Sequence, residues 1–134
     1  MSHYRESQAR IDEAEAALRE GDDVRARALY GEAARLQGAL LDEVPADRVR
    51  TRSVYGLSVA TLLHRAGDLD GAARLAQELL AEPWIEAHSA GGLRLLLDRI
   101  ESDRGASAPR VRPARLGLRL RRSVPVRRRR TSGP

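Results

Sequence analysis

The side chains that most often carry chemistry are few and widely spaced in this sequence. Its three histidines are His3, His64 and His88, and no HExxH motif or other close ligand spacing joins them. The chain has no cysteine, so it holds neither a disulfide nor a Cys-ligated metal. His64 falls in the last turn of a predicted helix, where a cation interacts favourably with the helix dipole, and we expect His88 to be a half-buried packing residue.

One short stretch resembles a calcium-binding loop but does not fit it. If Gly71 took the sixth position of such a loop, Ala66 would stand first and Gln77 twelfth, where the loop needs Asp and Glu. Asp68 and Asp70 are better explained as helix caps. Nothing in the chain resembles a P-loop, a dinucleotide-binding fingerprint or a nucleophile elbow. We therefore predict that the protein is not an enzyme and has no metal site or cofactor.

The composition predicts one small domain with a core of aliphatic residues and alanine. The 134 residues include no Phe, and the aromatic side chains are one Trp and three Tyr. All 24 basic residues are Arg, which we interpret as the codon bias of a GC-rich bacterial genome. There is no apolar run of about 18 residues and the first residues are charged, so we expect no membrane span, no secretory segment and a cytoplasmic location.

Charge divides the chain into two regions. Residues 1–104 carry 14 Arg against 19 Asp and Glu, a net charge of −5, whereas residues 105–134 carry 10 Arg and no acid, a net charge of +10. The basic character of the whole chain therefore belongs to its last 30 residues. We predict a helical domain over residues 1–104 and a disordered, Arg-rich tail over residues 105–134.

The spacing of apolar residues predicts five helices and no strand before residue 105. Gly, Asp and Pro residues supply the expected helix ends and N-caps. The predicted helices cover residues 2–20, 24–42, 48–66, 69–81 and 84–102. Their expected N-caps are Ser2, either Asp22 or Asp23, Asp47, and either Asp68 or Asp70. The third and fifth helices are expected to bury Tyr55, Val59, Leu62, Trp84, Leu93 and Ile100.

Two further features concern helix packing. An apolar stripe on the first helix is predicted by four residues that recur at spacings near seven and three to four, namely Tyr4, Ile11, Ala14 and Leu18. Gly31 and Gly38 lie on one face of the second helix, which suggests a close contact with another helix there. The alternative is that both glycines only reflect GC-rich codons. The pair Gly91-Gly92 predicts a kink or a loosened turn in the fifth helix.

The best-formed unit is the stretch from Leu62 to Leu80, which predicts two helices folded back on each other at Gly67-Asp68. A second copy surrounds Gly21-Asp22, 46 positions earlier. Glycine can take the left-handed conformation that ends a helix, and the aspartate can cap the next one. Superposing the two turns aligns Ala26 with Ala72, Tyr30 with Ala76 and Ala33 with Leu79.

This pattern resembles the tetratricopeptide repeat, whose helix-turn-helix unit has Gly-Asp at the turn followed by small and aromatic residues at set positions. Residues 21–33 keep the turn, Ala26, Tyr30 and Ala33, and residues 67–83 keep the turn, Ala72 and the closing Pro83. The likeness covers about residues 10–103. The copies lie 46 positions apart instead of the 34 of the family, so the helices must be longer.

The resemblance implies an all-α fold of two stacked antiparallel helical hairpins. Either the fifth helix caps the stack, or the chain dimerises. An unrelated helical bundle is the alternative. The implied function is that of a non-enzymatic adaptor or scaffold that binds a protein or peptide on a concave face. In such a module polar residues should line one groove, and the helix faces expected at the surface give four candidate protein-binding residues: Arg25, Arg52, Ser53 and Arg74.

The tail supports a second hypothesis. Its arginines would be attracted to phosphates of RNA or DNA, to anionic lipid or to acidic protein surfaces, and without aromatic residues it would bind nucleic acid without sequence preference. In that case the helical body would serve oligomerisation. Otherwise the tail solubilises the chain, folds onto the acidic body or is a barely selected extension. The candidate anion contacts are Arg119, Arg121, Arg122, Arg127, Arg128, Arg129 and Arg130.

Overall fold

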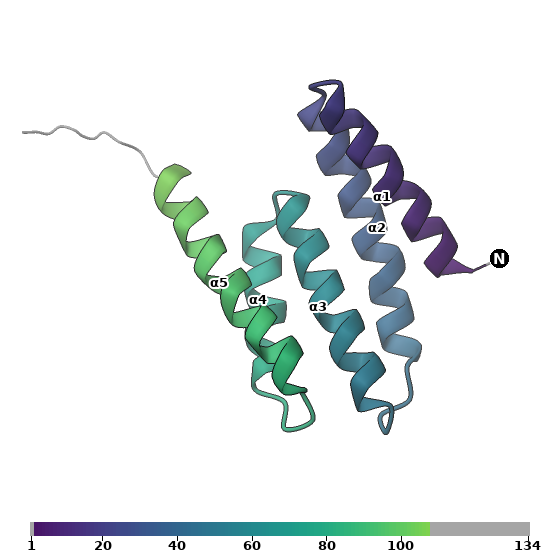
Figure 1. Cartoon of the computed structure of the whole chain (residues 1–134), viewed down its shortest axis with the longest axis vertical. Helices are drawn as coiled ribbons and strands as arrows, with labels where there is room; N and C mark the ends of the chain where they lie inside the picture. The colour runs from purple at the N-terminus through teal and green to yellow at the C-terminus, as the bar shows by residue number, and fades with distance from the viewer. Residues whose placement is uncertain (1, 108–134) are drawn as a thin grey trace, which may run out of the picture. The chain divides into compact units, whose positions relative to one another are not determined.

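The computed structural model describes residues 2–107, and these residues form five α-helices and no strand (Figure 1). The helices are α1 (His3–Arg19), α2 (Asp23–Glu43), α3 (Val49–Arg65), α4 (Leu69–Leu80) and α5 (Ala87–Ser107). The prediction of an all-α fold with two antiparallel hairpins and a fifth helix is therefore confirmed. The predicted tail lies outside the described residues from position 108 onward.

The chain divides into two units at Ser102, and the packing described below belongs to the first unit. In that unit α1 packs against α2, α2 against α3, and α3 against α4. The backbones of α1 and α3 do not meet within the described residues, because α2 lies between them as their common neighbour. Each of these two helices therefore keeps part of its surface uncovered.

The core consists of two clusters that join at α3. The first cluster lies between α1 and α2 and reaches Leu62 of α3, and the second unites α3, α4 and α5 around Leu93 and Ile100. Alanine supplies more than half of the buried apolar positions, including Ala14, Ala60 and Ala72, which are all fully buried. Such small side chains let helix backbones approach closely, which compensates for the absence of Phe.

The two predicted Gly-Asp turns have the same hydrogen-bond pattern. Gly21 and Gly67 have φ angles of 79° and 87°, and the amide of each donates to the carbonyl three residues earlier at 3.0 Å. The amides of Asp22 and Asp68 donate to the carbonyls five residues earlier, at 2.8 and 3.0 Å. Each aspartate also accepts from the amide three residues later, so one residue closes one helix and caps the next.

A buried serine recurs in α1, α3 and α5. Each of these serines is at most 2% exposed, and in each helix an aliphatic residue follows four positions later. The three pairs are Ser7 with Ile11, Ser53 with Leu57, and Ser89 with Leu93. The first helices of the two hairpins and α5 thus share one packing pattern, in addition to the matching turns.

Gln37 connects three helices through hydrogen bonds. This residue of α2 is 2% exposed, its Nε2 donates to Ser7 Oγ of α1 at 3.1 Å, and its Oε1 accepts from Ser58 Oγ of α3 at 2.6 Å. A buried amide is costly to leave without partners, so this arrangement fixes how α1 and α3 are placed on α2.

The connection between α4 and α5 differs from its prediction. Trp84 was expected in the fifth helix, but α5 begins at Ala87 because the chain turns first, with the Ile85 amide donating to the Glu82 carbonyl. The segment is held to α3, since the Glu86 amide donates to Ser53 Oγ at 3.1 Å. The helix also runs beyond the predicted end, to Ser107.

Several side-chain predictions are wrong. The N-cap of α3 is Arg48 and not Asp47, because a turn from the Pro45 carbonyl to the Arg48 amide sets the helix start one residue later. His88 is exposed and not half-buried. Tyr4 and Leu18 are 48% and 47% exposed, because α1 turns its alanines toward α2 instead.

The glycines differ in role from their prediction. A Cβ on Gly38 would meet nothing within 4 Å and one on Gly31 would only touch Ala66 at an ordinary 3.8 Å, so no close contact explains this pair. Gly91-Gly92 leaves α5 continuous. A Cβ on Gly92, however, would lie 2.8 Å from Leu57 of α3, so this glycine permits α5 to pack there.

The adjacent glycines of α5 give a matched test of this packing. Gly91→Ala should raise the free energy of unfolding by about 0.5–1 kcal/mol, because alanine is the better helix former and its methyl group enters open space. Gly92→Ala should lower it by about 1 kcal/mol, because Leu57 must move. Urea unfolding followed by circular dichroism measures both. In a Leu57→Ala background the cost of Gly92→Ala should vanish, and an unchanged cost would contradict the proposed contact.

The Gln37 connection is tested by an apolar replacement of similar size. Gln37→Met should lower the free energy of unfolding by about 1–3 kcal/mol, because Ser7 and Ser58 lose their partner. Gln77→Met on the exposed face of α4 is the control and should change it by less than about 0.5 kcal/mol. Equal effects of the two substitutions in thermal or urea unfolding would show that the buried amide does not hold the helices in place.

Candidate functional site

A hollow with a volume of about 620 Å³ lies where α1, α2, α3 and α5 meet. We call it the basic hollow, because three arginines line it together with His64 and only one acid, Asp23. Its other lining residues are mainly apolar or small. The full lining consists of Leu18, Asp23, Ala26, Arg27, Tyr30, Thr61, His64, Arg65, Gly92, Leu95, Leu96 and Arg99.

A second hollow of about 510 Å³ lies between the first turns of α1 and α3, with Gln37 of α2 in its lining. We call it the tyrosine hollow, because Tyr4 and Tyr55 stand on its two sides. It contains one charged side chain, Arg50. Its lining residues are Tyr4, Gln8, Gln37, Arg50, Thr51, Val54, Tyr55 and Ser58.

Both hollows lie along the same face of α1 and α3. On α3, the residues at positions 54, 58, 61 and 65 follow one another at spacings of four, three and four, so they lie on one side of the helix. Val54 and Ser58 line the tyrosine hollow, whereas Thr61 and Arg65 line the basic hollow. On α1 the same holds for Tyr4 and Leu18. We call this surface the α1/α3 face.

Exposed apolar side chains gather on this face. Five large hydrophobic residues within the described residues are exposed, and four of them line one of the two hollows. Leu18 (47%) and Leu95 (72%) lie at the basic hollow, and Tyr4 (48%) and Val54 (56%) at the tyrosine hollow. Scattered exposed leucines need no explanation, but apolar side chains that concentrate on one hollowed face are typical of an interaction surface.

Local contacts hold the arginines of the basic hollow. The Arg65 guanidinium lies 5.7 Å from the centre of the buried Tyr30 ring, within the range of a cation–π contact. The stem of Arg27 passes over the turn at Gly67, where a Cβ would meet Arg27 Cδ at 3.4 Å. Arg27, Arg65 and Arg99 come from α2, α3 and α5, so tertiary structure brings them together.

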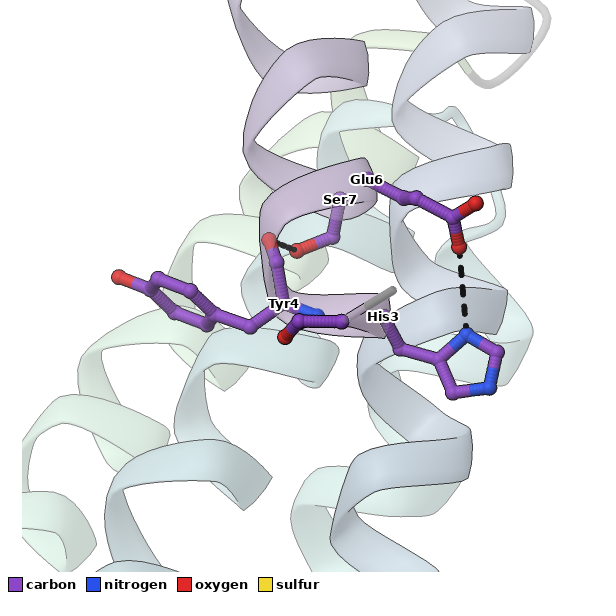
Figure 2. A network of polar contacts seen from close by, with 5 residues as sticks. His3, Tyr4, Glu6 and Ser7 are labelled. Atoms are coloured by element: carbon purple, nitrogen blue, oxygen red, sulfur yellow. Dashed lines mark hydrogen bonds and ion pairs between the residues drawn. The ribbon is translucent and has the colours of Figure 1, made fainter.

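The first turn of α1 orients Tyr4 at the edge of the tyrosine hollow (Figure 2). Ser2 Oγ accepts from the Tyr4 amide at 3.2 Å, and Ser7 Oγ donates to the Tyr4 carbonyl at 2.7 Å. The Tyr4 ring points away from His3, which contacts Glu6 at 3.4 Å on the other side of the helix. The serine that Gln37 binds therefore also fixes the backbone of Tyr4.

A third, smaller hollow of about 310 Å³ contains one of the predicted site residues, Arg52. Its guanidinium lies 4.5 Å from the centre of the Trp84 ring, and its Nε is buried without a hydrogen-bond partner. Three carboxylates, those of Asp42, Glu78 and Glu82, line the same hollow. Arg52 thus helps to attach the connection between α4 and α5 to α3.

The four predicted protein-binding residues do not form one site. Ser53 is fully buried, and its Oγ accepts from the Glu86 amide, so its hydroxyl group serves the interior of the chain. Arg25 and Arg74 are exposed and line neither the basic hollow, the tyrosine hollow nor the hollow around Arg52. The predicted anion contacts from Arg119 to Arg130 lie outside the described residues.

Sequence reasoning missed Arg27, Arg65 and Arg99. One signal was available: Tyr4 and Leu18 fall 14 positions apart on one side of α1, next to the predicted hairpin turn. These two members of the predicted apolar stripe are exposed and line the two hollows. The arginines themselves carry no local signal, because they belong to three helices.

No metal centre or membrane segment emerges from residues 2–107. Within this range no three His, Asp or Glu side chains gather as metal ligands would. Nor does a described helix combine the length and the apolar character that crossing a membrane requires. Comparison with family models, with curated proteins and with solved structures gives no match to this chain.

Proposed function

We propose that this chain is a non-enzymatic protein-binding module, an adaptor or scaffold, that binds its partner on the α1/α3 face. One observation carries the proposal: four of the five exposed large hydrophobic residues of the described part line the two hollows of this face. Burying such side chains against a partner contributes about 25 cal/mol for each Å² removed from water. The tetratricopeptide-like arrangement inferred from the Gly-Asp hairpins is part of this proposal.

Other features agree with a binding surface. Leu18 and Leu95 are 47% and 72% exposed, although their chain neighbours Ala17 and Leu96 are buried. Gln37 and the Gly-Asp turns give the face a rigid base, which lowers the entropy that binding must cost. The Arg-rich tail adds ten positive charges and, in this proposal, electrostatic attachment to acidic surfaces.

The rival function is nonspecific binding of RNA or DNA through the tail, with the body serving oligomerisation. The ten arginines and the absence of acids after residue 104 favour it. In this rival the exposed apolar side chains of the α1/α3 face would serve oligomerisation at most and would not bind a different protein. That difference allows the two functions to be separated.

The test is quantitative affinity purification from the native organism with the tagged full-length chain, after nuclease treatment. The double variant Leu18→Ser/Leu95→Ser should lose most of the proteins that the wild type retains, because the basic hollow loses its apolar rim. The control is Val24→Ser, because Val24 is 77% exposed and lines neither hollow of this face. This variant should retain the wild-type set.

Two results would contradict the proposal. In the first, the double variant retains the same proteins as Val24→Ser and the wild type, which would show that the α1/α3 face does not bind them. In the second case, nuclease treatment releases everything that the wild type had bound, which would favour the rival. Circular dichroism should show equal helix content in all three chains, because the substituted side chains are exposed.

A further inference from the structure

We infer that the basic hollow binds the side-chain carboxylates of an acidic, leucine-containing segment of the protein partner. This inference rests on the proposed function and specifies the chemistry of the partner. It follows from the three arginines in the lining of one hollow, from the absence of an ion-pair partner for them among residues 2–107, and from the apolar rim beside them.

The three arginines are suited to carboxylates. A guanidinium presents a rigid fork of N–H donors that matches the two oxygens of a carboxylate, and it is charged at every physiological pH. Arg65 rests against the Tyr30 ring and Arg27 against the turn at Gly67, so less side-chain freedom remains to be lost on binding. Arg99 completes the group from α5.

The helices of residues 2–107 do not neutralise these three charges through ion pairs. Among the described residues no carboxylate forms an ion pair with Arg27, Arg65 or Arg99, although the domain has more acids than bases. Arg10, by contrast, pairs with Glu13 at 3.1 Å and with Glu32 at 3.0 Å. With three arginines and one carboxylate, that of Asp23, in its lining, the basic hollow is complementary in charge to an anionic ligand.

The surroundings favour a peptide over a nucleic acid. Leu18 and Leu95 stand exposed in the lining and can cover leucine side chains between the carboxylates. Tyr30 is the aromatic residue of this hollow and is only 2% exposed, so it cannot stack on a base. Residues 1–104 carry a net charge of −5, which repels a long polyanion. A short acidic segment interacts mainly with the charges within a Debye length of about 8–10 Å, and in the basic hollow these are mostly positive.

Fluorescence anisotropy with defined probes tests the inference. The probe is a labelled ten-residue peptide of alternating Glu and Leu, the matched probe has Gln in place of Glu, and a labelled oligo-dT of similar length represents nucleic acid. The full-length chain is compared with Arg27→Gln/Arg65→Gln/Arg99→Gln. We expect this variant to bind the Glu peptide about tenfold more weakly than the wild type, and the wild type to prefer the Glu over the Gln peptide.

A second triple variant controls for net charge. Arg5→Gln/Arg48→Gln/Arg94→Gln removes the same three charges from exposed positions that line neither the basic nor the tyrosine hollow. It keeps the tail and should bind the Glu peptide within about threefold of the wild type, because charges exposed elsewhere are screened. Helix content by circular dichroism verifies that both variants fold.

Each remaining outcome overturns the inference. These outcomes are no saturable binding of the Glu peptide, equal losses in the two triple variants, or no loss in either. Loss of oligo-dT binding confined to the hollow variant would assign the arginines to nucleic acid. The proposed function is tested separately. If Leu18→Ser/Leu95→Ser weakens the binding of both peptides while the wild type binds the Glu and Gln peptides equally, the α1/α3 face binds proteins without recognising carboxylates, and only the inference fails.

Discussion

The packing of α1 and α3 against α2, and not against each other, is the constraint on which the rest of the account depends. Gln37 fixes it, because its buried amide binds Ser7 on one side and Ser58 on the other. Two helices that share a neighbour in this way leave a face between them, and the tyrosine and basic hollows lie along it. The surface is thus a consequence of how the core is assembled.

Features with a local cause could be predicted from the sequence. The turns at Gly21 and Gly67 need only a residue that tolerates positive φ, followed by an aspartate cap, and both are as expected. Failures occurred where tertiary contacts decide. Trp84 leaves the predicted helix because the connection is held to α3, and Gly92 matters through Leu57, which is 35 positions away.

The candidate site was beyond sequence reasoning for the same reason. Arg27, Arg65 and Arg99 resemble any other arginine in a chain with 24 of them, and only the packing of α2, α3 and α5 brings them together. Ser53, chosen as a surface residue, is instead one of three buried serines in α1, α3 and α5. Stability thus depends on the serines and alanines that face inward, and function, in this account, on leucines and arginines of the same helices.

The most direct measurement is a nuclear magnetic resonance titration of the ¹⁵N-labelled full-length chain with the Glu-Leu peptide. We expect the largest amide shifts on α1, the start of α2, the end of α3 and the middle of α5, around Leu18, Arg27, Arg65 and Leu95. Amides of the exposed side of α4, such as Gln77, should stay unchanged. Shifts confined to residues 108–134, or spread evenly over the helices, would contradict a binding site on the α1/α3 face.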